Sequence, residues 1–290
     1  MTCEAKGGTG KACMAAAPST LPVVAHHLRK PADVCTDKRD METPIELGDL
    51  GPAGAAASWE NHARLALLNE LYAYNHWLFD KVRLFIKDSV CEVGCGTGNI
   101  TQFLLNHEQI VGIEPFGPSL EKARRRFAKH LNVEFANCRL ADSPNELVPA
   151  KSFDTILCMN VLEHIEDDAD SLRRMLQLCR SNGNVVVLVP AHMSAFGGLD
   201  RAAGHFRRYN RRSLRRAFEQ AGLIVTDSFY MNALGYFGWL WYGRILGREQ
   251  LPASGARHFN RLVPLLDAFE RIIPPPFGQS LVMVGTPERQ

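Results

Sequence analysis

Hydrophobic and polar residues follow two alternating patterns between residues 58 and 286. Short apolar runs such as "SVCEV" (89–93) and "NVVVLVP" (184–190) are typical of strands buried on both faces. Longer segments between them repeat apolar residues every three or four positions, as amphipathic helices do. Strands are expected at 89–93, 110–114, 133–138, 153–160, 184–190, 223–230 and 280–286, and helices at 99–106, 119–130, 168–180 and 211–222. The alternation predicts an α/β fold with a mostly parallel, seven-stranded sheet and helices on both faces.

An N-terminal helical region is predicted ahead of the first strand, over residues 58–88. Its apolar residues at positions i, i+4, i+7 and i+8 share one face of a helix and are Leu78, Val82, Phe85 and Ile86. This face is expected to pack against the sheet.

The last two strands are separated by a long insert, residues 231–278, which is predicted to be partly helical and to cap the site. Residues 229–246 are aromatic and apolar, but they are fewer than the roughly 20 residues that a membrane-spanning helix needs. Asn232 and Arg244 also interrupt the stretch. A cap helix is therefore favoured, and contact with a lipid or another apolar ligand is the alternative.

Residues 1–56 are rich in Ala, Gly, Pro, Thr and Lys and show no periodicity. Such a composition predicts a disordered or loosely attached segment, followed by one domain over residues 57–290. The first residues contain no apolar core long enough for a secretory signal, so we expect a cytoplasmic location.

Composition narrows the class of protein further. Of the 290 residues, 46% are hydrophobic and 22% are charged, as in globular proteins, and the net charge of +2 does not by itself indicate nucleic-acid binding. The eight cysteines form no Cys-x-x-Cys pair, so we expect reduced thiols and no metal site.

The loop "GCGTG" follows the first strand and carries Gly94, Cys95, Gly96 and Gly98. In an open α/β sheet, ligands bind at the carboxyl ends of the strands. The spacing G-x-G-x-G is one residue shorter than a dinucleotide fingerprint, and the Gly-Lys-Ser/Thr of a phosphate loop does not follow. The loop therefore indicates a nucleotide-like ligand other than a dinucleotide or a nucleoside triphosphate.

Two carboxylates near the loop indicate the charge and the sugar of that ligand. Glu92 precedes the loop by two positions, where it would repel a phosphate and suits a ligand with a cationic end. Glu114 ends the second strand, about 20 residues beyond the first glycine, where a carboxylate accepts the two hydroxyls of a ribose. Together they predict a nucleoside with a positively charged substituent.

The segments "VCEVGCGTGNIT", "VGIEP" and "FDTILCMNVLEHIED" together resemble the class I S-adenosylmethionine-dependent methyltransferases. The resemblance covers about residues 58–286 and implies a Rossmann-like fold. The later segment "VPAHMSAFGGLDRAAGHFRRYN" is similar to a bacterial-type subgroup that acts on small molecules.

The resemblance implies a set of cofactor contacts. The glycine loop would pack against the methionine part of the cofactor, with Glu92 toward its ammonium group and Glu114 and Pro115 at the ribose. Many relatives have Gly-Asp-Ala beside the adenine where this chain has Cys138-Arg139-Leu140, so either Arg139 and Leu140 flank the ring or Asp142 substitutes from a shifted position. The remaining expected contacts are Asn160, Val161, Tyr74 and Trp77.

Residues after the fifth strand are expected to face the acceptor. A base is needed only if the acceptor must lose a proton, as a phenol or an alcohol does. The candidates for acid/base chemistry or acceptor contact are His192, His205 and Tyr209, with Asp200, Arg201 and Arg208 nearby. The arginine run over 207–216 is interpreted mainly as a solvated helix face, in which one or two side chains hold an anionic group.

A methyltransferase for a small hydrophobic or aromatic molecule is the favoured function, with O-, N- and C-methylation left open. An RNA methyltransferase is an alternative, although Asn160-Val161-Leu162-Glu163 replaces the Asp/Asn-Pro-Pro-Tyr of adenine-modifying enzymes. A non-catalytic cofactor-binding protein is another, and a nicotinamide dehydrogenase is disfavoured by the glycine spacing. A homodimer and peripheral lipid contact stay open.

Overall fold

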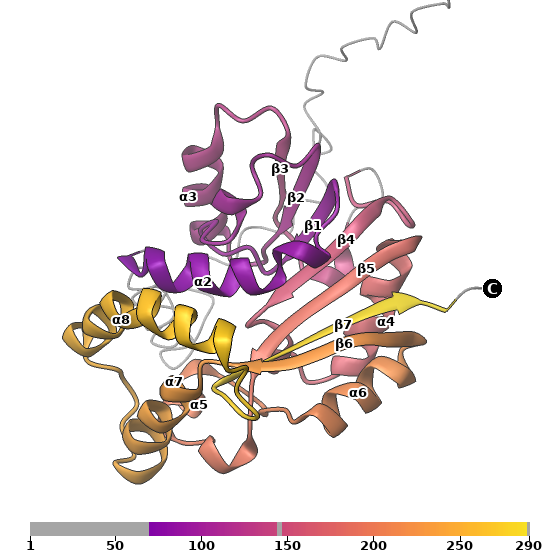
Figure 1. The fold of residues 1–290 in the computed structure, drawn as a ribbon. Helices are drawn as coiled ribbons and strands as arrows, with labels where there is room; N and C mark the ends of the chain where they lie inside the picture. The colour runs from indigo at the N-terminus through magenta and orange to yellow at the C-terminus, as the bar shows by residue number, and fades with distance from the viewer. Residues whose placement is uncertain (1–69, 144–146, 289–290) are drawn as a thin grey trace, which may run out of the picture. The chain divides into compact units, whose positions relative to one another are not determined.

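The computed structural model describes residues 70–143 and 147–288, which form one seven-stranded sheet in the order β3-β2-β1-β4-β5-β7-β6 (Figure 1). Strands β1 to β5 pair in parallel, and β7 runs antiparallel to both β5 and β6. The strands are β1 (Ser89–Val93), β2 (Gln109–Ile113), β3 (Val133–Ala136), β4 (Phe153–Met159), β5 (Cys179–Pro190), β6 (Leu223–Met231) and β7 (Ser280–Pro287). The predicted fold class and all seven strands are confirmed.

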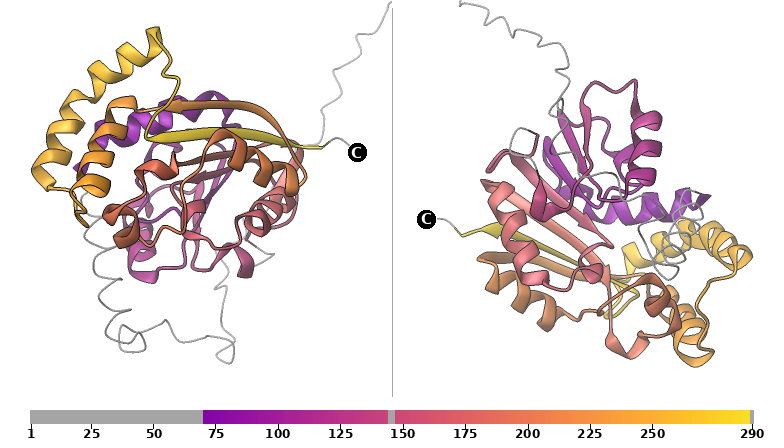
Figure 2. Two further views of the ribbon diagram at one scale, coloured as in Figure 1. Left: turned by 90° about the horizontal axis from the view of Figure 1, so that it is seen from below. Right: turned by 180° about the vertical axis from the view of Figure 1, so that it is seen from behind.

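The apolar run of β5 explains why helices cover both faces of the sheet. Because successive side chains of a strand point to opposite faces, Val185 and Val187 enter one core, and Val186 and Leu188 enter the other. The first core packs against α4 (Asp168–Leu178) and α6 (Arg211–Gln220). The second packs against α2 (Tyr72–Val82) and α8 (Ala253–Ile272) on the opposite face (Figure 2).

The predicted N-terminal helix is present but ends earlier than expected. Leu78 and Val82 of α2 are buried, as their spacing predicts. A 3-10 turn follows over Arg83–Phe85, and Ile86 is already extended. The start of this region and the expected segment 1–56 lie outside the described residues.

The predicted helix over 99–106 is wrong, because only a 3-10 turn over Thr101–Phe103 forms there. Asn99, Ile100 and Thr101 all have low helix propensity. Thr101 also turns its hydroxyl to Glu92, 2.6 Å away, which holds the turn against the end of β1. The α3 helix (Gly117–Phe127) forms close to its predicted bounds.

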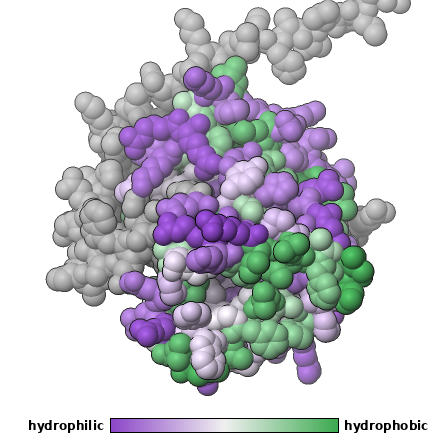
Figure 3. Space-filling view, turned by 60° about the vertical axis from the view of Figure 1, so that its left-hand side comes forward, coloured by the Kyte–Doolittle hydropathy of each residue, from purple (hydrophilic) through white to green (hydrophobic). Residues whose placement is uncertain are grey.

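The insert between β6 and β7 is helical, as predicted. It contains α7 (Ala233–Trp239), a π-helical turn (Leu240–Ile245) and α8. No helix in the part of the chain that the structure describes is long and apolar enough to span a membrane. Large apolar side chains nevertheless stay exposed on the insert, and they include Phe237, Trp241, Ile245, Leu265 and Phe269. Figure 3 shows apolar surface gathered on one part of the molecule.

Candidate functional site

The glycine loop after β1 needs glycine for both conformation and space. Gly94, Gly96 and Gly98 all have positive φ, which side chains other than glycine rarely adopt. A Cβ built on Gly94 would lie 2.3 Å from Cγ2 of Val161, which follows β4. The loop is therefore a close-packed turn at the carboxyl ends of β1 and β4.

Glu114 follows β2 and reaches back to this loop. Its Oε2 accepts a hydrogen bond from the backbone N–H of Gly96 at 3.0 Å, and its Oε1 accepts one from Phe116 at 2.9 Å. Burial raises the pKa of Glu114, and these two hydrogen bonds oppose the rise. The side-chain amide of Asn137 donates to the carbonyl of Pro115 and anchors the turn behind the carboxylate.

Glu92 lies beneath the loop and is only 5% exposed. Burial raises its pKa to about 7, although the hydrogen bond from Thr101 lowers it. A carboxyl with this pKa is poised to ionise when a cation arrives. Burial likewise raises the pKa of the Cys95 thiol, which excludes a thiolate role for Cys95 at neutral pH.

The residues expected near the adenine lie in different environments, one in the core and the others at the surface. Leu140 is buried in the first core, whereas Arg139 is exposed. The guanidinium of Arg139 pairs with the carboxylate of Asp142 at 2.8 Å. The two charged candidates for this position thus contact each other at the surface.

Tyr74 and Trp77 of α2 belong to the second core. Trp77 is 2% exposed, and Tyr74 packs edge-on against Phe259 of α8 at 6.1 Å. Burial raises the pKa of Tyr74 to about 12. Tyr74 and Trp77 therefore join α2 to α8 and to the sheet.

The chain after β4 lines the other side of the loop. Asn160 is exposed and has a φ of +54°, and its backbone N–H donates to the carbonyl of Leu188 in β5. Val161 packs against the loop, and Glu163 is almost completely buried. This arrangement leaves Asn160 at the carboxyl end of β4 beside the glycine loop.

His192 lies just beyond β5, with a φ of +63°. Its ring stacks on Tyr230 at 4.9 Å and meets Tyr236 edge-on at 5.4 Å. Burial and the charge of Arg208 lower the pKa of His192, which keeps the ring neutral. Its buried Nε2 has no hydrogen-bond partner among the described residues.

The backbone of Tyr209 pairs with Ala191, just beyond the carboxyl end of β5. Its side chain lies in the first core, and its hydroxyl donates to Asp168 at the start of α4 at 2.8 Å. Burial, reinforced by the neighbouring carboxylate, raises the pKa of Tyr209. The structure thus makes Tyr209 a donor to α4.

His205 occupies a different environment, between two buried carboxylates. Its Nδ1 lies 2.9 Å from Oδ1 of Asp200, and its Nε2 lies 3.9 Å from Oε1 of Glu163. The ring also meets His164 edge-on at 4.7 Å. His205 thereby connects the segment after β5 to the segment after β4.

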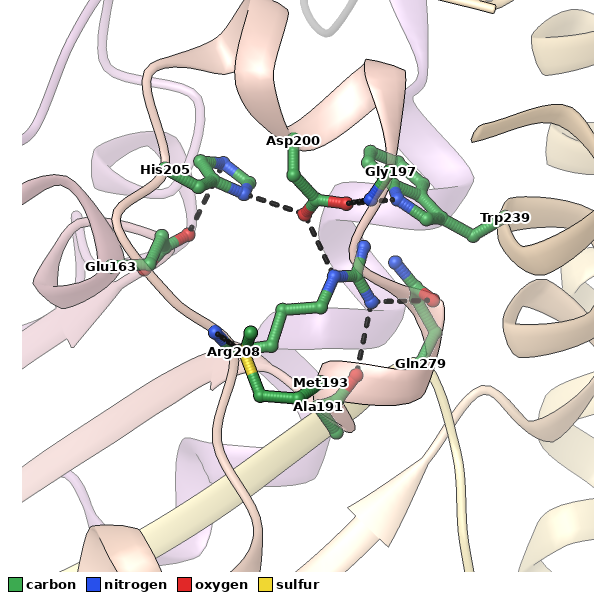
Figure 4. Close-up of polar contacts among 9 residues, drawn as sticks. All are labelled: Glu163, Ala191, Met193, Gly197, Asp200, His205, Arg208, Trp239 and Gln279. Atoms are coloured by element: carbon green, nitrogen blue, oxygen red, sulfur yellow. Dashed lines mark hydrogen bonds and ion pairs between the residues drawn. The ribbon is translucent and has the colours of Figure 1, made fainter. Parts of the chain in front are cut away.

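Asp200 and Arg208, which the sequence placed toward the acceptor, instead form a buried ion pair (Figure 4). Asp200 lies in α5 (Gly198–Ala203), a helix that the sequence pattern did not predict. The indole N–H of Trp239 in the insert also donates to Asp200, at 3.0 Å. Sequence reasoning missed this contact because nothing in the local pattern relates residues 39 positions apart.

The arginine run on α6 is mainly a solvated face, as predicted. Arg211, Arg212, Arg215 and Arg216 are exposed. Arg207, just before α6, pairs with Asp168 at 3.0 Å.

A cavity of about 480 Å³ lies beside β6, and Tyr230 forms a wall between it and His192. None of the predicted cofactor or catalytic residues lines this cavity. Its lining residues are Lys81, Arg211, Phe229, Tyr230, Glu270, Pro274, Pro275 and Pro276.

Comparisons with known proteins agree with this geometry. Residues 61–228, more than half of the chain, match the profile of the methyltransferase domain family. The ubiquinone biosynthesis O-methyltransferase of Rhodopseudomonas palustris strain TIE-1 is 31% identical over 98 residues, or 33% of this chain and 37% of that relative. The chain thus matches well under half the length of this relative.

Two solved structures share the fold at low sequence identity. A chain in the complex of the Haloferax volcanii Trm112 methyltransferase activator with a methyltransferase matches with a TM-score of 0.55 and 16% identity, over 80% of this chain and 96% of its own length. A SAM-dependent methyltransferase from Archaeoglobus fulgidus matches with a TM-score of 0.51 and 13% identity, over 75% and 94%.

Proposed function

The chain belongs to the methyltransferase domain family, and we propose that it transfers a methyl group from S-adenosylmethionine to a hydroxyl group of a small apolar or aromatic molecule. The observation that carries the proposal is the glycine loop with Glu92 beneath it and Glu114 bonded to its backbone. This arrangement binds a nucleoside with a cationic substituent better than it binds a pyrophosphate.

The residues present fit this cofactor. A Cβ at Gly94 or Gly98 would lie within 2.3 Å of the side chain of Val161 or Phe127, so the tight turn that would hold the cofactor accepts only glycine at these positions. Glu92 would hold the ammonium group, and Glu114 would exchange its backbone hydrogen bonds for the ribose hydroxyls. When bound, the cofactor supplies an electrophilic methyl group on a sulfonium, and the protein contributes orientation and exclusion of water.

The acceptor side favours an aromatic or apolar molecule. Next to His192, the rings of Tyr236, Phe237 and Phe277 meet one another edge-on with centroids 5.5 to 5.7 Å apart. Such a cluster suits a flat ring. The curated relatives that act in ubiquinone biosynthesis as O-methyltransferases support a hydroxyl as the acceptor atom.

Among the three catalytic candidates, His205 is the best placed to accept a proton. It lies between Asp200 and Glu163, which stabilise the positive charge that protonation creates. The neutral, stacked His192 is better suited to contact the acceptor ring. Tyr209 is committed to Asp168 and is assigned a structural role.

Cofactor binding is tested by thermal unfolding. S-adenosylmethionine or its demethylated product should raise the melting temperature, because a ligand that binds only the folded state stabilises it. NAD should not. Glu114→Ala should weaken binding by roughly 10- to 100-fold, since a charge-assisted hydrogen bond contributes about 1.5–3 kcal/mol. Glu121→Ala, which removes an exposed partner of Arg124, is the matched control.

Turnover is tested by measuring the demethylated cofactor with phenols, carboxylic acids, prenylated compounds and RNA. Methylation of phenols supports the proposal. Methylation of RNA alone would favour the alternative suggested by the exposed arginines of α6, and cofactor binding without any turnover would favour a binding protein. A homodimer, a cytoplasmic location and lipid contact through the insert remain predictions.

A further inference from the structure

Helix α8 carries large apolar side chains on two faces, and only one of these faces is buried. Phe259, Val263 and Leu266 point inward and pack in the second core against α2 and the sheet (Figure 2). A second set recurs at positions i, i+3, i+7 and i+10, which lie in one row along a helix. This set, the outer stripe, is 46% to 80% exposed and consists of Leu262, Leu265, Phe269 and Ile272.

The inner contacts of α8 fix its position without the outer stripe. The buried carboxylate of Glu270 accepts the backbone N–H groups of Asn232 at 3.1 Å and Ala233 at 2.9 Å, where the insert begins. The side chain of Asn260 accepts the N–H of Tyr74 in α2 at 2.8 Å. The fold therefore does not need a row of four large apolar side chains in water, and such a surface marks an interaction site.

The exposed charges near the outer stripe are mainly positive. The exposed arginines of α8 are Arg257, Arg261 and Arg271. Arg257 and Arg271 pair with carboxylates on or near α2, whereas Arg261, one helical turn before Leu265, has no ion pair with any described residue. Over the whole insert there are five arginines and three acidic residues, of which only Glu249 is exposed. The outer surface of the insert is therefore basic as well as apolar.

The α6 helix differs in this respect. Its arginines are exposed too, but its large apolar side chains, Leu214 and Phe218, are buried in the first core. A helix binds at a lipid surface when it combines apolar area with positive charge. Within the described helices α6 and α8, only α8 presents both to solvent.

A second copy of the chain fits the outer stripe less well than a lipid surface does. In a two-fold interface each copy presents the same surface to the other. Pairing two outer stripes would bring the arginines of two α8 helices together, while the acidic side chains of α8 stay turned inward. The phosphates of anionic lipids supply the missing negative charge, and their acyl chains receive the apolar side chains.

We propose that the outer stripe of α8 docks on a membrane surface that contains anionic lipids. The arginines bind headgroup phosphates, and the apolar side chains of the stripe enter the boundary between headgroups and acyl chains. Because its inner face stays packed on α2 and the sheet, α8 lies flat on the bilayer. The docking itself does not depend on methyl transfer, but its use in supplying apolar acceptors from the lipid phase rests on the proposed function.

The first test measures binding of the full-length protein to vesicles by co-sedimentation. The protein should bind vesicles of equal parts phosphatidylglycerol and phosphatidylcholine, and should bind pure phosphatidylcholine roughly tenfold more weakly; raised salt should also weaken binding, because it screens the arginines. Leu265→Ser combined with Phe269→Ser should weaken binding roughly 10²-fold, since two large side chains no longer enter the apolar phase. Leu131→Ser, which changes a 98% exposed leucine outside the insert, is the matched control and should bind as wild type.

The second test separates α8 from the basic surface of α6. Arg261→Gln should weaken binding to the anionic vesicles roughly fivefold, because one arginine at an anionic surface contributes about 1 kcal/mol. Arg212→Gln makes the same change on α6 and should leave binding unchanged. Equal losses in these two variants would mean that charge alone attracts the protein, and the docking of α8 would be wrong.

Unchanged vesicle binding in the variant with both stripe substitutions, or no binding by the wild type, would overturn the proposal. A dimer in light scattering that the same variant converts to monomers would also overturn it, because a second copy would then cover the stripe. Since the substituted side chains are exposed, all variants should keep the wild-type melting temperature and its rise with S-adenosylmethionine. Vesicle binding without this rise would support docking and contradict the proposed function, so the two failures are distinguishable.

Discussion

The cofactor side and the acceptor side of the site are held together by different kinds of contact. Around the glycine loop, Thr101 bonds Glu92 across 9 positions, and Gly96 bonds Glu114 across 18. On the acceptor side, Trp239 reaches Asp200 across 39 positions. The first region depends on backbone conformation at a few glycines, whereas the second depends on a buried charge network.

This difference predicts different weaknesses. Adding atoms to the loop should damage the cofactor side, because the space there is already filled. Removing a charge should damage the acceptor side, because the partner is then left buried without compensation. Changes of pH should separate the two regions as well, since one carboxyl titrates near neutrality and the other does not.

The largest effect is expected for Asp200→Ala. Breaking a buried ion pair by removing one partner costs about 3–5 kcal/mol, because the charge of Arg208 stays buried. Urea unfolding measures the loss. The control Asp170→Ala removes an exposed partner of Arg174 and should change the stability little, because water and salt screen an exposed ion pair. Equal losses in the two variants would show that the buried network does not hold the acceptor side together.

A smaller effect is expected for Gly94→Ala compared with Gly204→Ala. Both glycines have similar positive φ values, +72° and +74°, so both substitutions carry the same backbone penalty of about 1–2 kcal/mol. Only the Cβ at Gly94 meets a neighbour, Val161, and this overpacking adds about 1–3 kcal/mol. Thermal unfolding and cofactor titration compare the variants. If they are equally stable and bind alike, the loop is not close-packed.

The smallest effect is the pH dependence of cofactor affinity. With a pKa of about 7, Glu92 is mostly protonated at pH 6 and mostly ionised at pH 8, so affinity should be roughly tenfold weaker at pH 6. Calorimetric titration at both values measures it, and Glu92→Gln should remove the dependence. A wild-type affinity that does not change with pH would argue against Glu92 at the ammonium group.

The same shift affects the stability of the cofactor-free protein with the opposite sign. Because the folded-state pKa of Glu92 is raised from 4.5, its contribution to stability is full below pH 4.5 and is lost as the pH rises through about 7. Asp200, whose pKa is lowered from 3.8 to about 2, contributes above pH 3.8 and loses this contribution only as the pH falls through 2. Of these two carboxyls, only Glu92 should respond between pH 5 and 8.

The sequence by itself determined the strand and helix alternation and placed Glu92 and Glu114 beside the glycine loop. These features follow from side-chain periodicity, from the backbone freedom of glycine and from contacts between neighbouring strand ends, all of which are local. It predicted a helix at 99–106 from apolar spacing, but low propensity and the Thr101–Glu92 contact left a single turn.

Only the tertiary structure decided what the acceptor-side residues do. Asp200, Arg208 and Tyr209 all looked available to a substrate, yet the fold buries Asp200 and Arg208 against each other and Tyr209 against Asp168, 41 positions away. It also places His205 between the carboxylates of Asp200 and Glu163. Trp239 of the insert donates a hydrogen bond to the same Asp200. Burial and protonation depend on which groups the folded chain brings together, and no local pattern of residues contains that information.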